Sequence, residues 1–98
     1  MVRYTEEDGK LVCAFQERLD TENCTAFENG LIEKVSQLKD KTVVFNLTNV
    51  NYVSSLFLGI CMRAFKELGS GKFLLVSVSP NIKKVFKISG LDNYLEIH

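Results

Sequence analysis

The stretch from Thr42 to Lys66 is the feature that most constrains how this 98-residue chain can fold. It begins with Thr42–Phe45, a β-branched and aromatic run that predicts a buried central strand. The polar segment Asn46–Ser55 follows, and we interpret it as a loop. Apolar residues then recur at helical spacing, which predicts a helix whose buried face carries Leu58, Cys61, Met62, Phe65 and Leu68.

Two serines, Ser54 and Ser55, stand where this helix is predicted to begin. A serine hydroxyl at that place accepts a hydrogen bond from a first-turn N–H group that has no partner inside the helix. We therefore expect a capping role, with phosphorylation of Ser55 or Ser54 as the alternative. Leu56 and Phe57 follow, and they either tuck beneath the preceding loop or stay exposed as a contact site.

The rest of the chain predicts alternating strands and helices, with an opening hairpin whose second strand is covered on both faces. We expect one α/β domain over residues 1–98, with a mixed, mostly parallel sheet of four to five strands and three to four helices. The further strands are expected at 2–5, 10–15, 72–76 and 92–97, and the further helices begin at Asp20 or Thr21 and at Ser79–Pro80.

Hydrophobic periodicity also predicts which side chains form the core. On the last helix the apolar side is expected to carry Ile82, Val85, Phe86 and Ile88. Around the sheet as a whole, the residues expected to be buried are Phe27, Leu31, Val44, Leu58, Met62, Phe65, Leu75 and Phe86.

Charge and cysteine content limit the classes of partner and the compartment. Twelve basic and twelve acidic residues give a net charge of zero, so no general attraction to nucleic acid or to an anionic membrane is expected. No apolar run approaches the ~20 residues of a membrane span, and the acidic N-terminus does not fit a signal peptide. Cys13, Cys24 and Cys61 are expected to be reduced core thiols of a cytoplasmic protein.

Residues with catalytic chemistry are sparse, and we expect no enzymatic activity, no cofactor and no metal site. The one histidine, His98, ends the given sequence, which leaves no His-based triad or multi-His site. Glycine-rich phosphate-binding loops are absent, and Cys61 occupies a core position. Lys83, Lys84 and Lys87 are expected to lie together near Lys72, either as a solvated face or as a docking patch for an acidic partner.

The order of residues in three segments resembles the STAS domain of the anti-sigma-factor antagonists. Arg18-Leu19-Asp20 matches the family's Gly-Arg-Leu-Asp-like turn after the second strand, and Ser79-Pro80 followed by Gly90-Leu91-Asp92 matches its C-terminal pattern. In the central motif the family has Asp-Leu-Ser at the strand end and Asp-Ser-Ser-Gly-Leu-Gly at the helix start. This chain has Asn46-Leu47-Thr48 and Ser54-Ser55-Leu56-Phe57-Leu58-Gly59 at these places.

The resemblance implies a regulatory protein whose second serine is phosphorylated by a kinase-type anti-sigma factor. That acceptor falls on Leu56, which has no hydroxyl, and the acidic positions of the motif fall on Asn46 and Ser54. The resemblance therefore implies partner binding without the usual phosphoswitch. The residues expected to bind the partner are Asn46, Thr48, Asn49, Asn51, Ser54, Ser55, Leu56 and Phe57.

The expected partner is a kinase-type anti-sigma factor or a related regulatory protein, and the chain is expected to be a monomer or a weak homodimer. The alternative is a STAS domain that senses a small ligand or nucleotide at the same loop. Co-elution of a nucleotide with the purified protein would favour the alternative.

Overall fold

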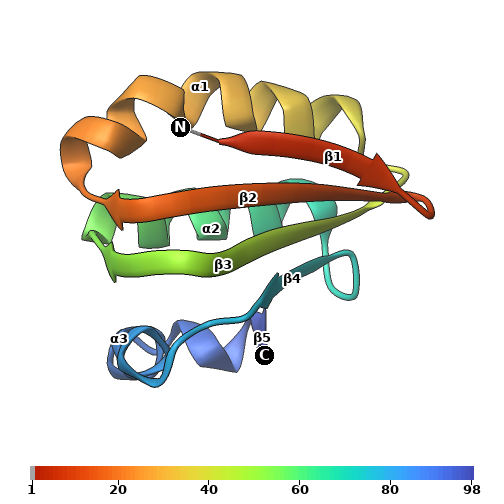
Figure 1. The fold of residues 1–98 in the computed structure, drawn as a ribbon. Coiled ribbons are helices and arrows are strands. Elements are labelled where there is room, and N and C mark those ends of the chain that lie inside the picture. The colour runs from red at the N-terminus through yellow and green to blue at the C-terminus, as the bar shows by residue number, and fades with distance from the viewer. Residues whose placement is uncertain (1) are drawn as a thin grey trace.

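The alternation of strands and helices that the sequence predicts is present in the computed structural model, which describes residues 2–98 (Figure 1). Within these residues, five strands form one sheet and three α-helices pack beside it, so the expected α/β class is confirmed. In chain order the elements are β1 (Arg3–Glu7), β2 (Lys10–Leu19), α1 (Thr21–Gln37), β3 (Thr42–Val53), α2 (Ser55–Leu68), β4 (Phe73–Val76), α3 (Pro80–Ile88), the 3₁₀ turn η1 (Leu91–Asn93) and β5 (Glu96–Ile97).

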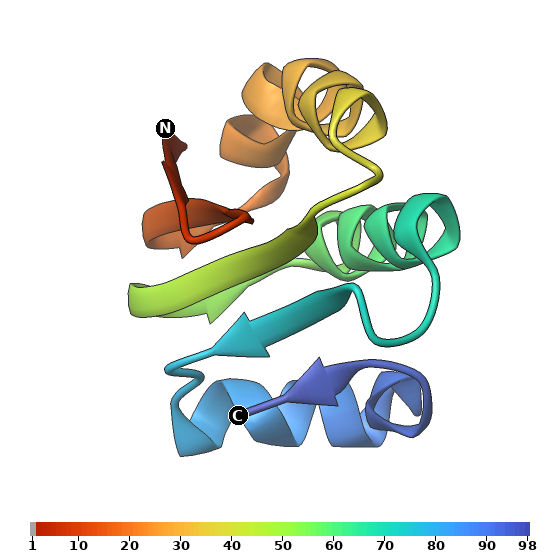
Figure 2. The same cartoon turned by 90° about the vertical axis from the view of Figure 1, so that its right-hand side faces the viewer.

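The strands lie in the sheet in the order of the chain, from β1 at one edge to β5 at the other. β1 pairs antiparallel with β2 as the predicted hairpin, and the three other neighbouring pairs are parallel. Helices α1 and α2 lie side by side on one face, whereas α3 lies beyond β4 beside β5 (Figure 2). Parallel strands end at the same edge, so β3 delivers the start of α2 next to the end of β2.

The second strand is not covered equally on both faces, contrary to the sequence-based expectation. Leu11, Cys13 and Phe15 are fully buried, whereas Val12 and Ala14 between them are only partly buried. This alternation is typical of a strand with one face packed on helices and the other more open to water. The prediction from the apolar run, that both faces of β2 are covered, is therefore wrong for the face that carries Val12 and Ala14.

The predicted loop at Asn46–Ser55 is wrong, because β3 continues to Val53. This strand stays paired with β2 to its end, with two irregularities of register. One lies between Ala14 and Gln16 of β2, and the other between Glu17 and Arg18. Such bulges break the two-residue alternation of side chains. Consequently the buried residues Leu47, Val50 and Val53 are three apart, a spacing that hid the strand from the sequence pattern.

The predicted phase of α2 is also shifted. Its fully or nearly fully buried side chains are Phe57, Ile60, Cys61, Ala64 and Leu68. Leu58, Met62 and Phe65, which we expected in the core, are only partly buried and pack at its margin, as does Phe27 of α1. Both sets have helical spacing on a helix with few polar residues, so periodicity alone favoured the wrong one. Leu31, Val44, Leu75 and Phe86 are buried as predicted.

The helix starts follow the predicted capping chemistry. Asp20 caps α1 by accepting a hydrogen bond from the Asn23 N–H, and Ser79 caps α3 with Pro80 as its first residue. Ile82 and Phe86 bury one side of α3. Val85 and Ile88 were expected there as well, but they are exposed, because the nine-residue helix contacts its neighbours along one narrow stripe.

Candidate functional site

The start of α2 is built around Ser54, whose side chain is only 8% exposed. Its backbone N–H donates to the carbonyl of Leu19 at the end of β2, and its Oγ accepts from the N–H of Phe57 at 3.4 Å. The cap that the sequence predicts is therefore confirmed at Ser54. Phosphorylation of Ser54 would break the hydrogen bond from the Phe57 N–H and expose the buried hydroxyl. These losses disfavour modification at Ser54.

The next residues alternate between solvent and core. Ser55, the first residue of α2, is exposed, and Leu56 is partly buried at the margin of the core. Phe57 is fully buried, with its ring centroid 5.2 Å from that of Phe15 and 6.1 Å from that of Phe45. Of the two alternatives for Phe57, the buried one holds. The helix packs this ring inward, and the expected role of Phe57 in binding a partner stays a prediction.

The exposed residues at the end of β3 and the start of α2 form one candidate surface. It consists of Thr48, Asn49, Asn51, Tyr52 and Ser55, and we call it the β3–α2 surface. Asn46 is half-buried beneath it, and its Oδ1 accepts from both the backbone N–H and the hydroxyl of Thr48. The segment from Asn46 to Met62 contains no Asp, Glu, Lys or Arg, so the surface is polar but uncharged.

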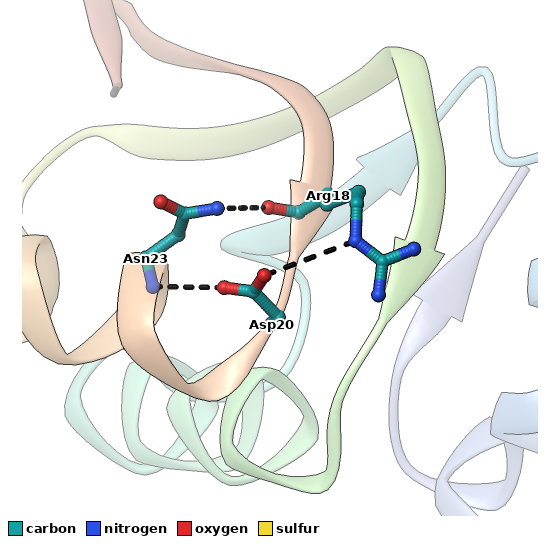
Figure 3. Close-up of polar contacts among 3 residues, drawn as sticks. All are labelled: Arg18, Asp20 and Asn23. Atoms are coloured by element: carbon teal, nitrogen blue, oxygen red, sulfur yellow. Dashed lines mark hydrogen bonds and ion pairs between the residues drawn. The ribbon is translucent and has the colours of Figure 1, made fainter.

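Arg18, drawn with Asp20 and Asn23 in Figure 3, brings a charged side chain to Tyr52 of this surface. It pairs directly with Tyr52 across β2 and β3, and its guanidinium carbon lies 4.3 Å from the centroid of the Tyr52 ring. Its Nε lies 3.8 Å from Oδ2 of Asp20, and its carbonyl accepts from the side chain of Asn23. These contacts hold the end of β2, the start of α1 and the end of β3 together.

Sequence reasoning missed Arg18 and Tyr52 as members of the candidate surface. Tyr52 is not among the residues that the sequence led us to expect at the partner contact, although it is 42% exposed. The pairing of the strands explains the contact of Arg18 with Tyr52. Because β3 extends to Val53, Arg18 at the end of β2 lies opposite Tyr52. A cation over an aromatic ring contributes about 0.5–1 kcal/mol at an exposed site, so the pair also stiffens this edge.

Groups with catalytic or metal-binding chemistry do not gather at this surface. Across residues 2–98, no group of three His, Cys, Asp or Glu side chains lies close enough to hold a metal ion. The three cysteines are free and buried, and burial raises the pKa of each thiol, to about 12 at Cys13. His98 follows β5, and its Nε2 is 2.8 Å from Oε2 of Glu96.

Two hollows lie elsewhere on the molecule. One is lined by α3 and the C-terminal segment, and the other by β1 and α1. Neither is lined by a residue of the β3–α2 surface. The segment where the alternative hypothesis places a small ligand therefore lines neither of these hollows.

The sequence matches the model of one protein family. The model of the STAS domain matches residues 1–98 of the chain. The chain belongs to the STAS domain family. Of the motif residues, Arg18-Leu19-Asp20 spans the end of β2 and the cap of α1, and Ser79-Pro80 begins α3.

Solved structures of anti-sigma-factor antagonists share this fold. A STAS domain protein of this kind from Planctomyces limnophilus has a TM-score of 0.87 at 21% identity, covering 99% of this chain and 87% of its own. An anti-sigma factor antagonist from Mycobacterium paratuberculosis has a TM-score of 0.86 at 22% identity, covering 100% and 84%. The Bacillus cell fate determinant SpoIIAA in its phosphorylated form has a TM-score of 0.72 at 20% identity, covering 100% and 91%.

At 20–22% identity, these structures show that the chain shares their fold. Among residues 2–98 no helix has the length and apolar character needed to cross a membrane.

Proposed function

We propose that this STAS domain, residues 1–98, is a non-enzymatic interaction module that binds a kinase-type anti-sigma factor or a related regulator. The proposed contact is the β3–α2 surface together with Arg18. Asn46, Ser54 and Leu56 support this surface from below, and Phe57 anchors it in the core. The observation that carries the proposal is the position of Ser54, Ser55 and Leu56 at the capped helix start of a STAS fold.

The proposed binding operates without the serine phosphoswitch. Leucine stands at the position of the family's acceptor, and the hydroxyl of Ser54 is buried and bonded to the Phe57 N–H. Phosphorylation would add about −1.5 to −2 charges to an interface and so weaken a complex. With Leu56 at this place, the partner's kinase activity has no acceptor at the usual position. We therefore propose that phosphorylation by that kinase does not control formation of the complex.

The composition of the β3–α2 surface fits such a contact. Two amide side chains (Asn49 and Asn51), two aliphatic hydroxyls (Thr48 and Ser55) and Tyr52 offer hydrogen-bonding groups without a charge to desolvate. Tyr52 and Arg18 are of the residue types enriched at binding hot spots. The Arg18–Tyr52 stacking holds both side chains in place before the partner arrives. Less side-chain entropy is then lost on binding.

Titration calorimetry with the recombinant kinase-type anti-sigma factors of the same genome tests the proposal. Asn51→Arg places a long charged side chain in the middle of the surface. We expect it to raise Kd at least about tenfold, which corresponds to about 1.4 kcal/mol. Asn29→Arg, at an exposed position of α1, is the matched control and should change Kd less than about twofold.

Both variants replace an exposed asparagine, so their melting temperatures should stay close to that of the wild type. Equal affinities for the wild type and Asn51→Arg would show that the β3–α2 surface is not the contact. If none of the anti-sigma factors binds, the proposed partner class is wrong.

A further inference from the structure

The hollow beside α3 gathers three lysines on one wall. It has a volume of about 440 Å³ and lies between α3, η1 and β5. Pro80, Lys83, Lys84 and Lys87 follow one another at helical spacing and form the α3 wall, whereas Asp92 and Ile97 form the other side. Lys72, which we expected beside these lysines, lies elsewhere, because its Nζ donates to the carbonyl of Lys39. We call this hollow the α3 groove.

The positive charge of the α3 groove is not neutralised by the chain itself. No ion pair in residues 2–98 includes Lys83, Lys84 or Lys87, and α3 contains no acidic residue. Like charges three or four residues apart on a helix destabilise it, so the arrangement has a cost in the isolated protein. Asp92 is the one carboxylate on the lining, and three ammonium groups outnumber it. An acidic occupant would neutralise the excess.

Apolar groups accompany the lysines. Pro80 and Ile97 line the groove, and lysine adds its aliphatic stem to such a surface while its ammonium group stays in water. The segment around it also holds Val85, Ile88 and Tyr94, with Ile88 80% and Tyr94 63% exposed. These are three of the five large hydrophobic side chains found exposed in residues 2–98. Exposed apolar side chains are therefore concentrated in the part of the sequence that forms the groove.

The edge strand adds backbone hydrogen-bonding groups. The N–H of His98 donates to Leu75, and the carbonyl of His98 accepts from Val78, so His98 faces β4. Successive residues of a parallel strand point their backbone groups to opposite sides, which directs those of Ile97 to the free edge. Ile97 lines the groove, and an extended segment lying there could bond to these groups.

We propose that the α3 groove is a second docking site, which binds an acidic, partly extended segment of a partner protein. Carboxylates of that segment pair with Lys83, Lys84 and Lys87, and its apolar side chains lie over Pro80 and Ile97. Nucleic acid fits less well, because the chain has no net positive charge and no aromatic side chain lines the groove. This site is separate from the β3–α2 surface in residues and in chemistry.

Titration of the ¹⁵N-labelled protein with a synthetic peptide tests the proposal by NMR at low ionic strength. The probe is a ten-residue peptide of six glutamates, two leucines and terminal glycines. We expect saturable shifts of the amides between Lys83 and Ile97. Replacing every glutamate with glutamine should abolish the shifts, and replacing the leucines with serine should weaken binding several-fold.

Charge reversal on the protein provides the matched comparison. Lys83→Glu, Lys84→Glu and Lys87→Glu together should raise the Kd for the acidic peptide at least about tenfold. The control combines Lys10→Glu, Lys66→Glu and Lys72→Glu, three exposed lysines outside the groove, and changes the net charge by the same amount. It should change Kd less than about twofold, because screened charges act over only about 10 Å. Replacing the same three groove lysines with glutamine removes their attraction for the peptide without adding repulsion. Comparison with the glutamate variant therefore separates the two effects.

Several outcomes would overturn the proposal. These are an absence of shifts between Lys83 and Ile97, equal weakening by the control variant, or saturation of the same amides by glutamate alone. Tighter binding of single-stranded DNA at the same residues would identify nucleic acid as the occupant instead. Self-association that the lysine reversal abolishes would identify a second copy, whose exposed residues Glu6, Glu7 and Asp8 at the end of β1 would then be the acidic segment.

Discussion

The ring of Phe57, in the first turn of α2, packs edge-on against the ring of Phe15 on β2, with 5.2 Å between their centroids. Phe15 also contacts Phe27 and Phe45, so the first turn of α2 is fixed to the centre of an aromatic cluster. Two residues before Phe57, Ser55 faces solvent on the β3–α2 surface. The same turn of helix thus supplies both the core and the proposed contact, and the core determines how the contact residues are presented.

Truncation of Phe57 should therefore be among the most destabilising single changes in the chain. Phe57→Ala removes a fully buried ring whose aromatic neighbours, Phe15 and Phe45, cannot fill the space, so we expect the free energy of unfolding to fall by about 3–5 kcal/mol. Phe65→Ala is the matched control on the same helix. Because Phe65 is only partly buried, the loss should be less than half as large. Urea denaturation of both variants measures the difference.

An equal loss in the two variants would contradict the phase of α2 described above. Should Phe57→Ala fail to fold, Phe57→Leu retains most of the apolar volume and should cost about 1–1.5 kcal/mol. Phe65→Leu then serves as its control, and it should have little effect on the unfolding midpoint.

The two serines at the start of α2 should differ in their contribution to stability. Ser54→Ala removes the acceptor for the Phe57 N–H and should lower the free energy of unfolding by about 1 kcal/mol. Ser55→Ala changes an exposed hydroxyl at the first helical position, and the expected effect is within about 0.5 kcal/mol. Thermal unfolding of both variants tests the assignment of the cap. A larger loss for Ser55→Ala would place the cap one residue later.

The fold could be predicted from the sequence wherever local chemistry and periodicity agree. Asp20, Ser54 and Ser79 mark helix starts because each has a short acceptor side chain before an apolar helical pattern. The order of elements and the parallel sheet follow from the same alternation. Motif residues then made the family recognisable before any three-dimensional information.

The candidate site could be predicted only in part, for two physical reasons. Bulges let Asn46 to Val53 continue as a strand in spite of its polar residues, and that pairing with β2 brings Arg18 to Tyr52. Such a register is a long-range property that no local pattern contains. The choice between Phe57 and Phe65 for the core depended on which face of α2 meets the sheet, and both faces are apolar. Tertiary packing determines which face of α2 is buried.

Stability should fall at alkaline pH because of the buried thiols. Burial raises the pKa of Cys13 to about 12, whereas an unfolded thiol ionises near its ordinary pKa of about 8.5. The folded state then keeps a proton that the unfolded state loses. The stability is therefore full below about pH 8.5, and it decreases as the pH rises toward 12, by about 1.4 kcal/mol per pH unit for each such thiol. Burial also raises the pKa of Cys24 and Cys61, which adds to the decrease.

Urea denaturation at pH 8, 9 and 10 under reducing conditions measures this slope. Cys13→Ala should lower stability at pH 8, but between pH 9 and 10 its stability should fall by about 1 kcal/mol less than that of the wild type. Val43→Ala shortens another fully buried side chain without removing a proton, so its difference from the wild type should stay constant with pH. Parallel slopes for the wild type and Cys13→Ala would show that this thiol does not contribute.

The last prediction concerns the missing phosphoacceptor. With ATP and a kinase-type anti-sigma factor that binds the chain, the wild type should acquire no stoichiometric phosphate at residues 54–56. Leucine has no hydroxyl at position 56, and the Ser54 hydroxyl is buried and bonded. Leu56→Ser supplies a hydroxyl at the family's acceptor position and should become phosphorylated, with weaker binding because about −1.5 to −2 charges are added. Leu56→Ala removes the same apolar group without adding a hydroxyl, so it should stay unlabelled, and its affinity for the partner gives the effect of losing the leucine side chain alone. Intact-mass spectrometry with site mapping distinguishes these cases. Stoichiometric phosphate on Ser55 of the wild type, abolished by Ser55→Ala, would show that the exposed serine has taken over the switch.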